Sequence, residues 1–416
     1  MIQKLKGTYD VYGDLSLKQD YVKKLFQAVC ENYNYKFIET PTFERSELFH
    51  RGVGDTTDIV TKETYDFKDR GDRDVTLRPE GTAGIARAVI ENKLYTTLPL
   101  KLWYTGSMFR YERPQKGRYR ELRQMGVELY GSNEPISDVE VISLGVNFLK
   151  ELGLDNVTVV INSIGGSETR KKYREALIKH FEKDIDDFCE DCKERLHKNP
   201  LRILDCKVDS DNELIKNAPN ILDYLNEEEK KNFESIKEYL DVLEIDYEVD
   251  NSLVRGLDYY TNLVFEFKTS LKDIGSIGGG GRYNDLLSSL DGPEVPSVGF
   301  AFGLDRIIDV INSLEIEIPK KDDLDVYILN VSENEINYSL SIMQDLRMCG
   351  YKVDMDLTNK SMKGKFKESE RYNSKYIIII GEEEINNGVL TLKDNLTKEE
   401  IKIEQDKLLD YLDVNV

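Results

Sequence analysis

The chain has 416 residues, more than a single hydrophobic core normally serves, so we expect two or three domains. Its 57 basic and 78 acidic residues give a net charge of −21, which argues against a generic nucleic-acid-binding protein but leaves room for a local basic surface. Five cysteines, an odd number in a long chain, argue against a disulfide framework. No apolar run approaches the ~20 residues of a membrane span, and the start "MIQKLKGTYD" is polar, so we expect a soluble cytoplasmic protein.

The first half of the chain combines one clear helix with several short strands. Ser16 and Gln19 fit an S-x-x-Q capping box, which predicts that an amphipathic helix begins there. Strands are predicted at "YKFIETP", at 74–78, 100–112 and 122–131, and twice within the glycine-rich segment 274–303. Because these strands cluster without a helix between each pair, they predict a largely antiparallel sheet in an α+β domain.

Two changes of pattern divide the rest of the chain. Residues 167–242 are highly charged and mostly helix-periodic between strand-containing flanks, so we interpret them as a helical insertion. Residues 315–325 contain Pro319 and several charges and predict a linker. Beyond it, strands alternate with helices at 333–348 and 361–371, which predicts a compact α/β unit.

One predicted strand carries a polar face. In "RQMGVELYG" alternate side chains share a face, so Gln124 and Glu128 point one way with Gly126 between them. Glycine leaves open space between an amide and a carboxylate, which favours a small-ligand site. A solvated polar face is the alternative for such a strand taken alone.

Other polar residues give weaker signals. Arg110 and Glu112 share a strand face next to a turn-prone loop with Arg118 at its rim, which fits either phosphate contacts or an ordinary hairpin tip. Glu80 follows Pro79 at the start of a predicted helix, where an acidic residue is favourable for the helix alone.

Arg255 poses a question within "LVRGLDYYTNLVFEF" (253–267), which predicts a strand, a turn and a second strand. A guanidinium is charged at any accessible pH, so it needs an anionic partner when buried. An internal carboxylate, Asp258 or Glu266, is one candidate, and a bound anion is the other. The four successive glycines at 278–281 allow a small ligand to approach the backbone, but they lack the spacing of a P-loop or a dinucleotide-binding fingerprint.

Taken in order, these motifs resemble the histidyl-tRNA synthetases, which are class II aminoacyl-tRNA synthetases, over essentially the whole chain. "YKFIETPTFERSELFHRGVG", "GSMFRYERPQKGRYRELRQMGVELYG" and "PSVGFAFGLDRI" are similar to motifs 1, 2 and 3 of the class. "TLRPEGTAG", "LVRGLDYY" and "GGRY" are similar to segments specific to the histidine enzymes.

The resemblance implies a catalytic domain built from residues 1–166 and 243–320, interrupted by the insertion at 167–242, and an anticodon-binding domain at 325–416. It implies that the protein activates L-histidine with ATP and Mg²⁺ and transfers histidine to the 3′ end of its tRNA, as a cytoplasmic homodimer. The alternative is a catalytically silent paralogue that serves as a regulatory subunit in histidine biosynthesis. Such subunits usually lack the C-terminal domain and the motif arginines.

The resemblance also implies roles for individual residues. The catalytic residues it implies are Arg255, Arg110 and Arg306, with Arg255 bridging the histidine carboxylate and the α-phosphate. The residues it implies for binding ATP are Arg110, Glu112, Arg118 and Arg306. The residues it implies for binding histidine are Glu80, Gly81, Thr82, Gln124, Glu128, Arg255, Tyr259, Tyr260 and Tyr283, among which Glu128 and Tyr260 read the imidazole.

The predicted insertion contains three cysteines. Cys189 and Cys192 form a C-x-x-C pair, and Cys206 follows with His197 between. A zinc site is one interpretation, but the sequence offers neither a second C-x-x-C nor a clear fourth ligand. We therefore favour reduced structural thiols and expect no metal bound by protein side chains.

Overall fold

The computed structural model describes residues 1–416 except 55–56, 58, 114–116, 272, 320–322 and 416. The chain divides into unit 1, residues 1–318, and unit 2, residues 319–416. Residues 320–322, in the middle of the predicted linker, lie outside the described part. None of the helices in the described ranges has the length and apolar composition to cross a membrane.

Unit 1 is built on an eight-stranded sheet in the order β1-β5-β6-β11-β10-β9-β7-β8. Only the pairs at the two edges, β1 with β5 and β7 with β8, are parallel. The predicted antiparallel α+β fold is therefore confirmed. The strands are β1 (Lys36–Phe37), β5 (Leu100–Phe109), β6 (Glu121–Tyr130), β7 (Val157–Ser163), β8 (Tyr247–Val249), β9 (Thr261–Thr269), β10 (Ser276–Arg282) and β11 (Ser297–Gly303).

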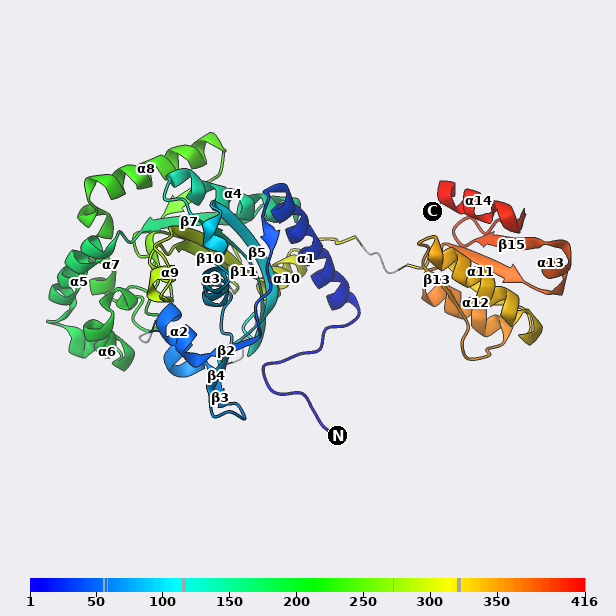
Figure 1. Cartoon of the computed structure of the whole chain (residues 1–416), viewed down its shortest axis with the longest axis horizontal. Helices are drawn as coiled ribbons and strands as arrows, with labels where there is room; N and C mark the ends of the chain where they lie inside the picture. Colours follow the sequence, from blue (N-terminus) through cyan, green and yellow to red (C-terminus); the bar gives the residue numbers. More distant parts are fainter. Residues whose placement is uncertain (55–56, 58, 114–116, 272, 320–322, 416) are drawn as a thin grey trace. The chain divides into compact units, whose positions relative to one another are not determined.

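Four helices cover one face of this sheet and bury a large apolar core against it (Figure 1). They are α1 (Asp14–Asn32), α4 (Pro135–Glu151), α8 (Glu227–Val242) and α10 (Leu304–Ser313). The predicted capping box of the first helix is wrong, because α1 begins two residues before Ser16. Gln19 is instead buried and donates through Nε2 to the Tyr9 hydroxyl at 3.0 Å.

The opposite face of the sheet carries shorter elements and a second apolar cluster. Helix α3 (Thr82–Glu91) and the short α9 (Leu286–Ser289) pack there. A small antiparallel sheet of β2 (Phe43–Arg45), β4 (Asp74–Leu77) and β3 (Tyr65–Lys68) projects below them in Figure 1, next to α2 (Ser46–Val53). This side of the main sheet holds the cavity described below.

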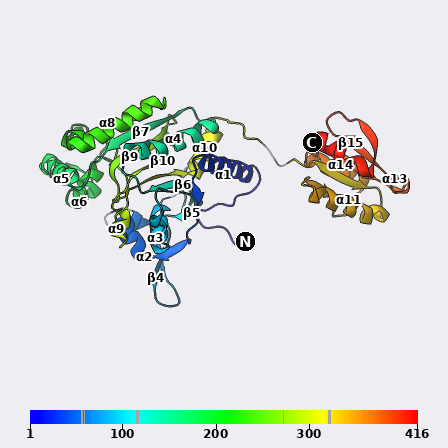
Figure 2. The same cartoon turned by 45° about the horizontal axis from the view of Figure 1, so that its top comes forward.

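The segment between β7 and β8 is helical, in agreement with its charged and helix-periodic sequence. It contains α5 (Ser167–Phe181), α6 (Glu190–Lys198), α7 (Glu213–Lys216) and α8. Both views place α5 and α6 together on the side of the sheet where β7 lies (Figures 1 and 2). Buried Leu177, Leu196 and Ile203 join these helices to the second apolar cluster of unit 1.

Unit 2 is a compact α/β body with a five-stranded sheet in the order β13-β12-β14-β15-β16. The first three strands are mutually parallel and the last two are antiparallel, which fits the predicted mixed sheet. Its strands are β12 (Val326–Asn330), β13 (Val353–Met355), β14 (Tyr376–Ile380), β15 (Val389–Asp394) and β16 (Glu400–Glu404). Its helices are α11 (Ile336–Met348), α12 (Met362–Arg371), α13 (Glu382–Asn387) and α14 (Leu408–Asn415).

Two predicted strands differ from the structure. "YKFIETP" forms only the two-residue β1, and the chain leaves the sheet well before Pro41. The first strand of 253–267 is absent, and residues 253–260 form an irregular loop before β9. The backbone explains this, because Leu253 N bonds to Asp250 O at 3.0 Å and Asp258 N to Val53 O at 3.2 Å rather than to a neighbouring strand.

Candidate active site

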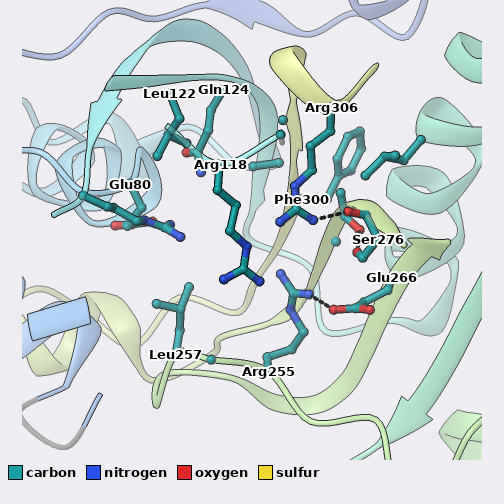
Figure 3. Close-up of a pocket in the computed structure, with 18 of the residues that line it drawn as sticks. Glu80, Arg118, Leu122, Gln124, Arg255, Leu257, Glu266, Ser276, Phe300 and Arg306 are labelled. Atoms are coloured by element: carbon teal, nitrogen blue, oxygen red, sulfur yellow. Dashed lines mark hydrogen bonds and ion pairs between the residues drawn. The ribbon is translucent and has the colours of Figure 1, made fainter. Parts of the chain in front are cut away.

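A cavity of about 600 Å³ opens on the sheet face that carries α3. Figure 3 shows side chains from β6, the loop after β5, the loop 253–260, β9, β10 and α10 pointing into it. Most of the residues predicted from the sequence line this cavity, namely Glu80, Thr82, Arg110, Glu112, Arg118, Gln124, Arg255, Tyr259, Tyr260, Tyr283 and Arg306. Gly81 and Glu128 are buried directly behind the wall.

Glu80 caps the start of α3. Its two carboxylate oxygens accept hydrogen bonds from the backbone N–H groups of Thr82 at 2.9 Å and Ala83 at 2.7 Å, and the Tyr259 hydroxyl lies 3.4 Å from Oε2. Burial raises the pKa of Glu80, while these two amides oppose the shift. The helix-start interpretation of Glu80 is thus correct, and its carboxylate also lies at the cavity wall.

Glu128 is held by two hydroxyl groups. It is 1% exposed and accepts from Thr82 Oγ1 at 2.8 Å and from the Tyr283 hydroxyl. Burial raises the pKa of Glu128 well above its ordinary value, and the Thr82 hydrogen bond only partly offsets the effect. Gly299 on β11 makes room for this carboxylate, because a Cβ there would lie 2.2 Å from Glu128 Oε2.

Aromatic side chains close this end of the cavity. The rings of Tyr259 and Tyr260 are 4.7 Å apart, and the ring of Tyr283 lies 5.4 Å from that of Tyr259. The Oε1 atom of Gln124 is buried without a hydrogen-bond partner within the described chain. An unpaired buried polar atom is costly, so at the wall of a cavity this oxygen is suited to accept a hydrogen bond from a ligand.

The other end of the cavity is rich in arginine. Arg110 Nε donates to the Pro79 carbonyl at 2.8 Å, and Arg118 Nη1 lies 3.4 Å from Glu112 Oε2. Arg306 donates to the Ser276 carbonyl. Burial, together with the nearby cations Arg118 and Arg110, lowers the pKa of Arg306, which indicates a concentration of positive charge that an anion would relieve.

Arg255 meets an internal carboxylate in this structure. Its Nη1 donates to Glu266 Oε1, one of the two partners considered from the sequence, whereas Asp258 bonds to Asn199 Nδ2 at 3.0 Å. The Nε atom of Arg255 is nevertheless buried without a partner in the described residues. Figure 3 shows the guanidinium pointing into the cavity toward Arg118 and Arg306. A Cβ at Gly279 would lie 2.7 Å from its Nη1, so the glycine run admits this side chain.

Several residues of the site escaped the sequence analysis. Tyr104 reaches the cavity because β5 pairs it with Gly126 on β6, where a larger residue would collide with its ring. Asp305 also lines the cavity, accepts from the Tyr9 hydroxyl and accepts from the Arg123 N–H at 3.0 Å. Strand alternation on β5 could have indicated Tyr104, but the link between Tyr9 and Asp305 had no signal in the sequence.

The cavity therefore combines two chemically distinct ends. The end near α3 offers buried carboxyl groups and phenols, which suit a small ligand that carries an ammonium group and hydrogen-bonding nitrogen atoms. The other end gathers the guanidinium groups of Arg110, Arg118, Arg255 and Arg306, which suit a polyphosphate. Such an arrangement can hold two substrates next to each other and stabilise negative charge where they meet.

A second group of polar residues lies in the segment after α5. The sulfur atoms of Cys189, Cys192 and Cys206 come together with a carboxylate oxygen of Asp209, all within 4.8 Å of one another. His197, considered from the sequence, does not belong to this group, and Asp209 was missed.

Two families match the chain. The one described as "Histidyl-tRNA synthetase" matches residues 7–307, and the one described as "Anticodon binding domain" matches residues 325–415. Among curated proteins, the "Histidine--tRNA ligase" of Bacillus cytotoxicus is 47% identical over 417 residues, covering 99% of this chain and 98% of the relative. The protein of the same name from Bacillus subtilis is 47% identical over 415 residues, with the same coverage.

Solved structures also resemble this chain. The apo histidyl-tRNA synthetase of Staphylococcus aureus superimposes with a TM-score of 0.85 at 39% identity, covering 99% of this chain and 100% of that one. A Bacillus halodurans structure titled as an ATP phosphoribosyltransferase regulatory subunit/histidyl-tRNA synthetase has a TM-score of 0.67, covering 92% of this chain and 98% of its own. At 22% identity, this second likeness concerns the fold alone.

Proposed function

The chain belongs to the histidyl-tRNA synthetase family, and from this premise we infer that it is an aminoacyl-tRNA ligase that joins L-histidine to tRNA. The two-ended cavity is the observation that carries the assignment of the active site. Its carboxyl end suits the ammonium and imidazole groups of histidine, and its arginine end suits the triphosphate of ATP.

The first half-reaction forms histidyl-adenylate. A carboxylate oxygen of histidine attacks the α-phosphorus of ATP, the bond from that phosphorus to the bridging oxygen breaks, and pyrophosphate leaves. The attack brings two anions together, so cations aimed at the phosphoryl oxygens lower its barrier. We assign Arg255 to the carboxylate and α-phosphate, and Arg110, Arg118 and Arg306 to the phosphates, with Glu112 at the nucleotide.

The second half-reaction consumes the adenylate. A hydroxyl of the terminal ribose of tRNA attacks the carbonyl carbon, AMP leaves with the electron pair of the broken bond, and the hydroxyl proton is released. We assign unit 2 to binding the anticodon of this tRNA, which the family match at 325–415 supports.

Recognition of histidine is assigned to the buried carboxyl end. We propose that Glu128 and Tyr260 read the imidazole, which presents one donor and one acceptor when it is neutral. Glu80, Thr82 and Gln124 hold the α-amino group, and the unpaired Oε1 of Gln124 supports this assignment. The remaining predicted residues, Gly81, Tyr259 and Tyr283, shape the pocket.

Three further assignments accompany this function. Mg²⁺ brought by ATP fits the site, because Glu112 presents a carboxylate at the arginine end, and the ion would offset triphosphate charge. A homodimer through the motif 1 region is supported by the exposed rings of Phe37 and Phe43, which are 52% and 59% accessible. A cytoplasmic location is supported by the five cysteines, which are all free thiols and suit a reducing compartment.

The alternative function, a regulatory subunit without catalysis, is disfavoured by two observations. Arg110, Arg255 and Arg306, the arginines of the motifs, all line the cavity, and the anticodon-binding match is present as well. Pyrophosphate exchange into ATP, run separately with each proteinogenic amino acid, tests the proposal. Exchange that depends on histidine is expected, whereas no exchange with any amino acid would favour the regulatory function.

A further inference from the structure

Three thiols and one carboxylate meet beside α6. Cys189 is the residue that precedes this helix, Cys192 lies in its first turn, and Cys206 and Asp209 follow it. Cys192 and Cys206 are buried, and the other two are half-buried. The cysteines are free, and the sulfur atoms of Cys189 and Cys206 are 3.7 Å apart, far beyond the ~2.05 Å of a disulfide bond.

The spacing of these atoms matches tetrahedral coordination. Two thiolates bound to zinc at ~2.3 Å are about 3.8 Å apart, and a thiolate and a carboxylate oxygen are about 3.5 Å apart. The Cys189–Cys206 sulfur pair lies at 3.7 Å, and Cys206 Sγ lies 3.4 Å from Asp209 Oδ2. We propose that Cys189, Cys192, Cys206 and Asp209 bind one Zn²⁺ ion, which would draw the widest pair, at most 4.8 Å apart, together by about 1 Å.

Two backbone amides contact atoms of the proposed ligand set. The N–H of Cys189 donates to Asp209 Oδ2 at 3.1 Å, and the N–H of Asp209 donates to Cys206 Sγ at 3.5 Å. Such amide contacts orient ligand atoms and stabilise their negative charge. The start of α6 adds its positive dipole end at the C-x-x-C pair. Asp209 supplies the fourth ligand that the sequence did not reveal.

Zinc is the ion that this donor set selects. Three sulfur ligands are too soft for Mg²⁺ or Ca²⁺, which take oxygen ligands, whereas zinc binds sulfur and carboxylate in tetrahedral sites. All four positions are filled by side chains, which is the arrangement of a structural site. The ion would therefore stabilise the fold of the segment from Cys189 to Asp209.

The segment from Cys189 to Asp209 contacts the loop that carries Arg255. Between Cys192 and Cys206, Asn199 Nδ2 donates to Asp258 Oδ1 at 3.0 Å and Arg202 Nη1 donates to the Arg255 carbonyl at 3.3 Å. Asp205 and Lys207, the two residues next to Cys206 in the chain, line the active-site cavity. The zinc site would thus position the loop 253–260. This consequence rests on the proposed function, whereas the metal site itself does not.

Metal analysis of the untagged full-length protein tests the site. About one zinc ion per chain is expected after dialysis, and a mercurial reagent that blocks thiols should release it to a colorimetric indicator. Cys206→Ser and Asp209→Asn should lower the zinc content, while Cys349→Ser, an exposed thiol in unit 2, should leave it unchanged. Wild-type protein with negligible zinc after growth in zinc-supplemented medium, or an equal loss in Cys349→Ser, would overturn the proposal.

Because a ligand variant can fail to fold, the wild-type chain provides an independent measurement. Metal-free protein titrated with Co²⁺ should develop thiolate-to-cobalt charge-transfer absorption and the intense visible bands of a tetrahedral site. Only weak octahedral bands would contradict the site. Histidine-dependent pyrophosphate exchange should slow in metal-free protein and recover with zinc. Unchanged exchange would refute the link to Arg255, and exchange absent even in the zinc-loaded protein would refute the proposed function instead.

Discussion

Replacing Arg255 by alanine distinguishes the two roles that its position allows. The guanidinium pairs with Glu266, so it neutralises an internal carboxylate. It also points into the cavity next to the other arginines, and its Nε has no partner within the described residues. A purely structural role predicts a loss of stability without a change in the rate per folded molecule, whereas a catalytic role predicts a loss of rate.

The two effects differ in size and in kind. Removing one donor aimed at the developing charge of a transition state lowers the rate by about 10²–10³-fold, or ~3–4 kcal/mol. Breaking the ion pair is expected to cost less than the ~3–5 kcal/mol of a fully buried pair, because the side chains of Arg255 and Glu266 are 20% and 17% exposed. We therefore expect a moderate fall in melting temperature and a large fall in adenylate formation.

Single-turnover kinetics give the readout, with active sites titrated so that rates refer to folded enzyme. Arg255→Ala should form histidyl-adenylate about 10²–10³-fold more slowly and should transfer histidine from preformed adenylate with a smaller loss, because no phosphorus is attacked in that step. Glu266→Gln is the matched control, since it removes the same ion pair and keeps the cation. It should lose similar stability and much less activity.

Equal rate losses in Arg255→Ala and Glu266→Gln would refute the catalytic role. A destabilised Arg255→Ala enzyme with normal adenylate formation would also refute it, and would show that Arg255 serves only the internal ion pair with Glu266.

The remaining predictions concern specificity, pH, the second unit and assembly. Glu128→Gln should raise the KM for histidine by about 10²-fold or more and the KM for ATP little, because the proposed buried partner of the imidazole is changed; parallel shifts in both would count against this role. Burial raises the pKa of Glu128 above 4.5, so the unfolded chain ionises first and wild-type stability falls as pH rises from 4.5 toward the raised value. The melting temperature of Glu128→Gln relative to wild type should therefore increase from pH 5 to pH 8, and a constant difference would show that Glu128 is ionised in the folded protein. Removing residues 319–416 should preserve histidine-dependent pyrophosphate exchange and abolish charging of tRNA, and a folded fragment that loses both activities would count against the role assigned to unit 2. Light scattering should give a dimer that Phe43→Asp weakens, and a fully active wild-type monomer would contradict the assembly.

The main sheet could be predicted because its strands follow simple alternation. On β6, Met125, Val127 and Leu129 enter the core, while Gln124 and Glu128 face the other side. This pattern depends only on local chain geometry, so the sequence was sufficient to reveal it. The loop 253–260 was mistaken for a strand because its apolar residues are as dense as those of a strand. Leu253 is instead buried in the second apolar cluster, and Leu257 lines the cavity.

Contacts between distant segments could not be predicted. Tyr104 reaches the site through the register of β5 with β6, and Asp209 completes the cysteine cluster through the turns after α6. Glu266 as the partner of Arg255 was one of two candidates, and only the pairing of β9 in the folded sheet decides between them. In each case the information lies in tertiary structure rather than in residue type or spacing.

The most direct test of the central claim is the complete reaction. The purified full-length protein is incubated with ATP, Mg²⁺, total bacterial tRNA and each proteinogenic amino acid in turn, and the aminoacyl ester on the tRNA is quantified after acid precipitation. We predict that histidine alone is esterified to tRNA, and that Arg255→Ala loses this activity. Failure of the wild-type protein to charge tRNA with histidine, or efficient charging with another amino acid, would contradict the account.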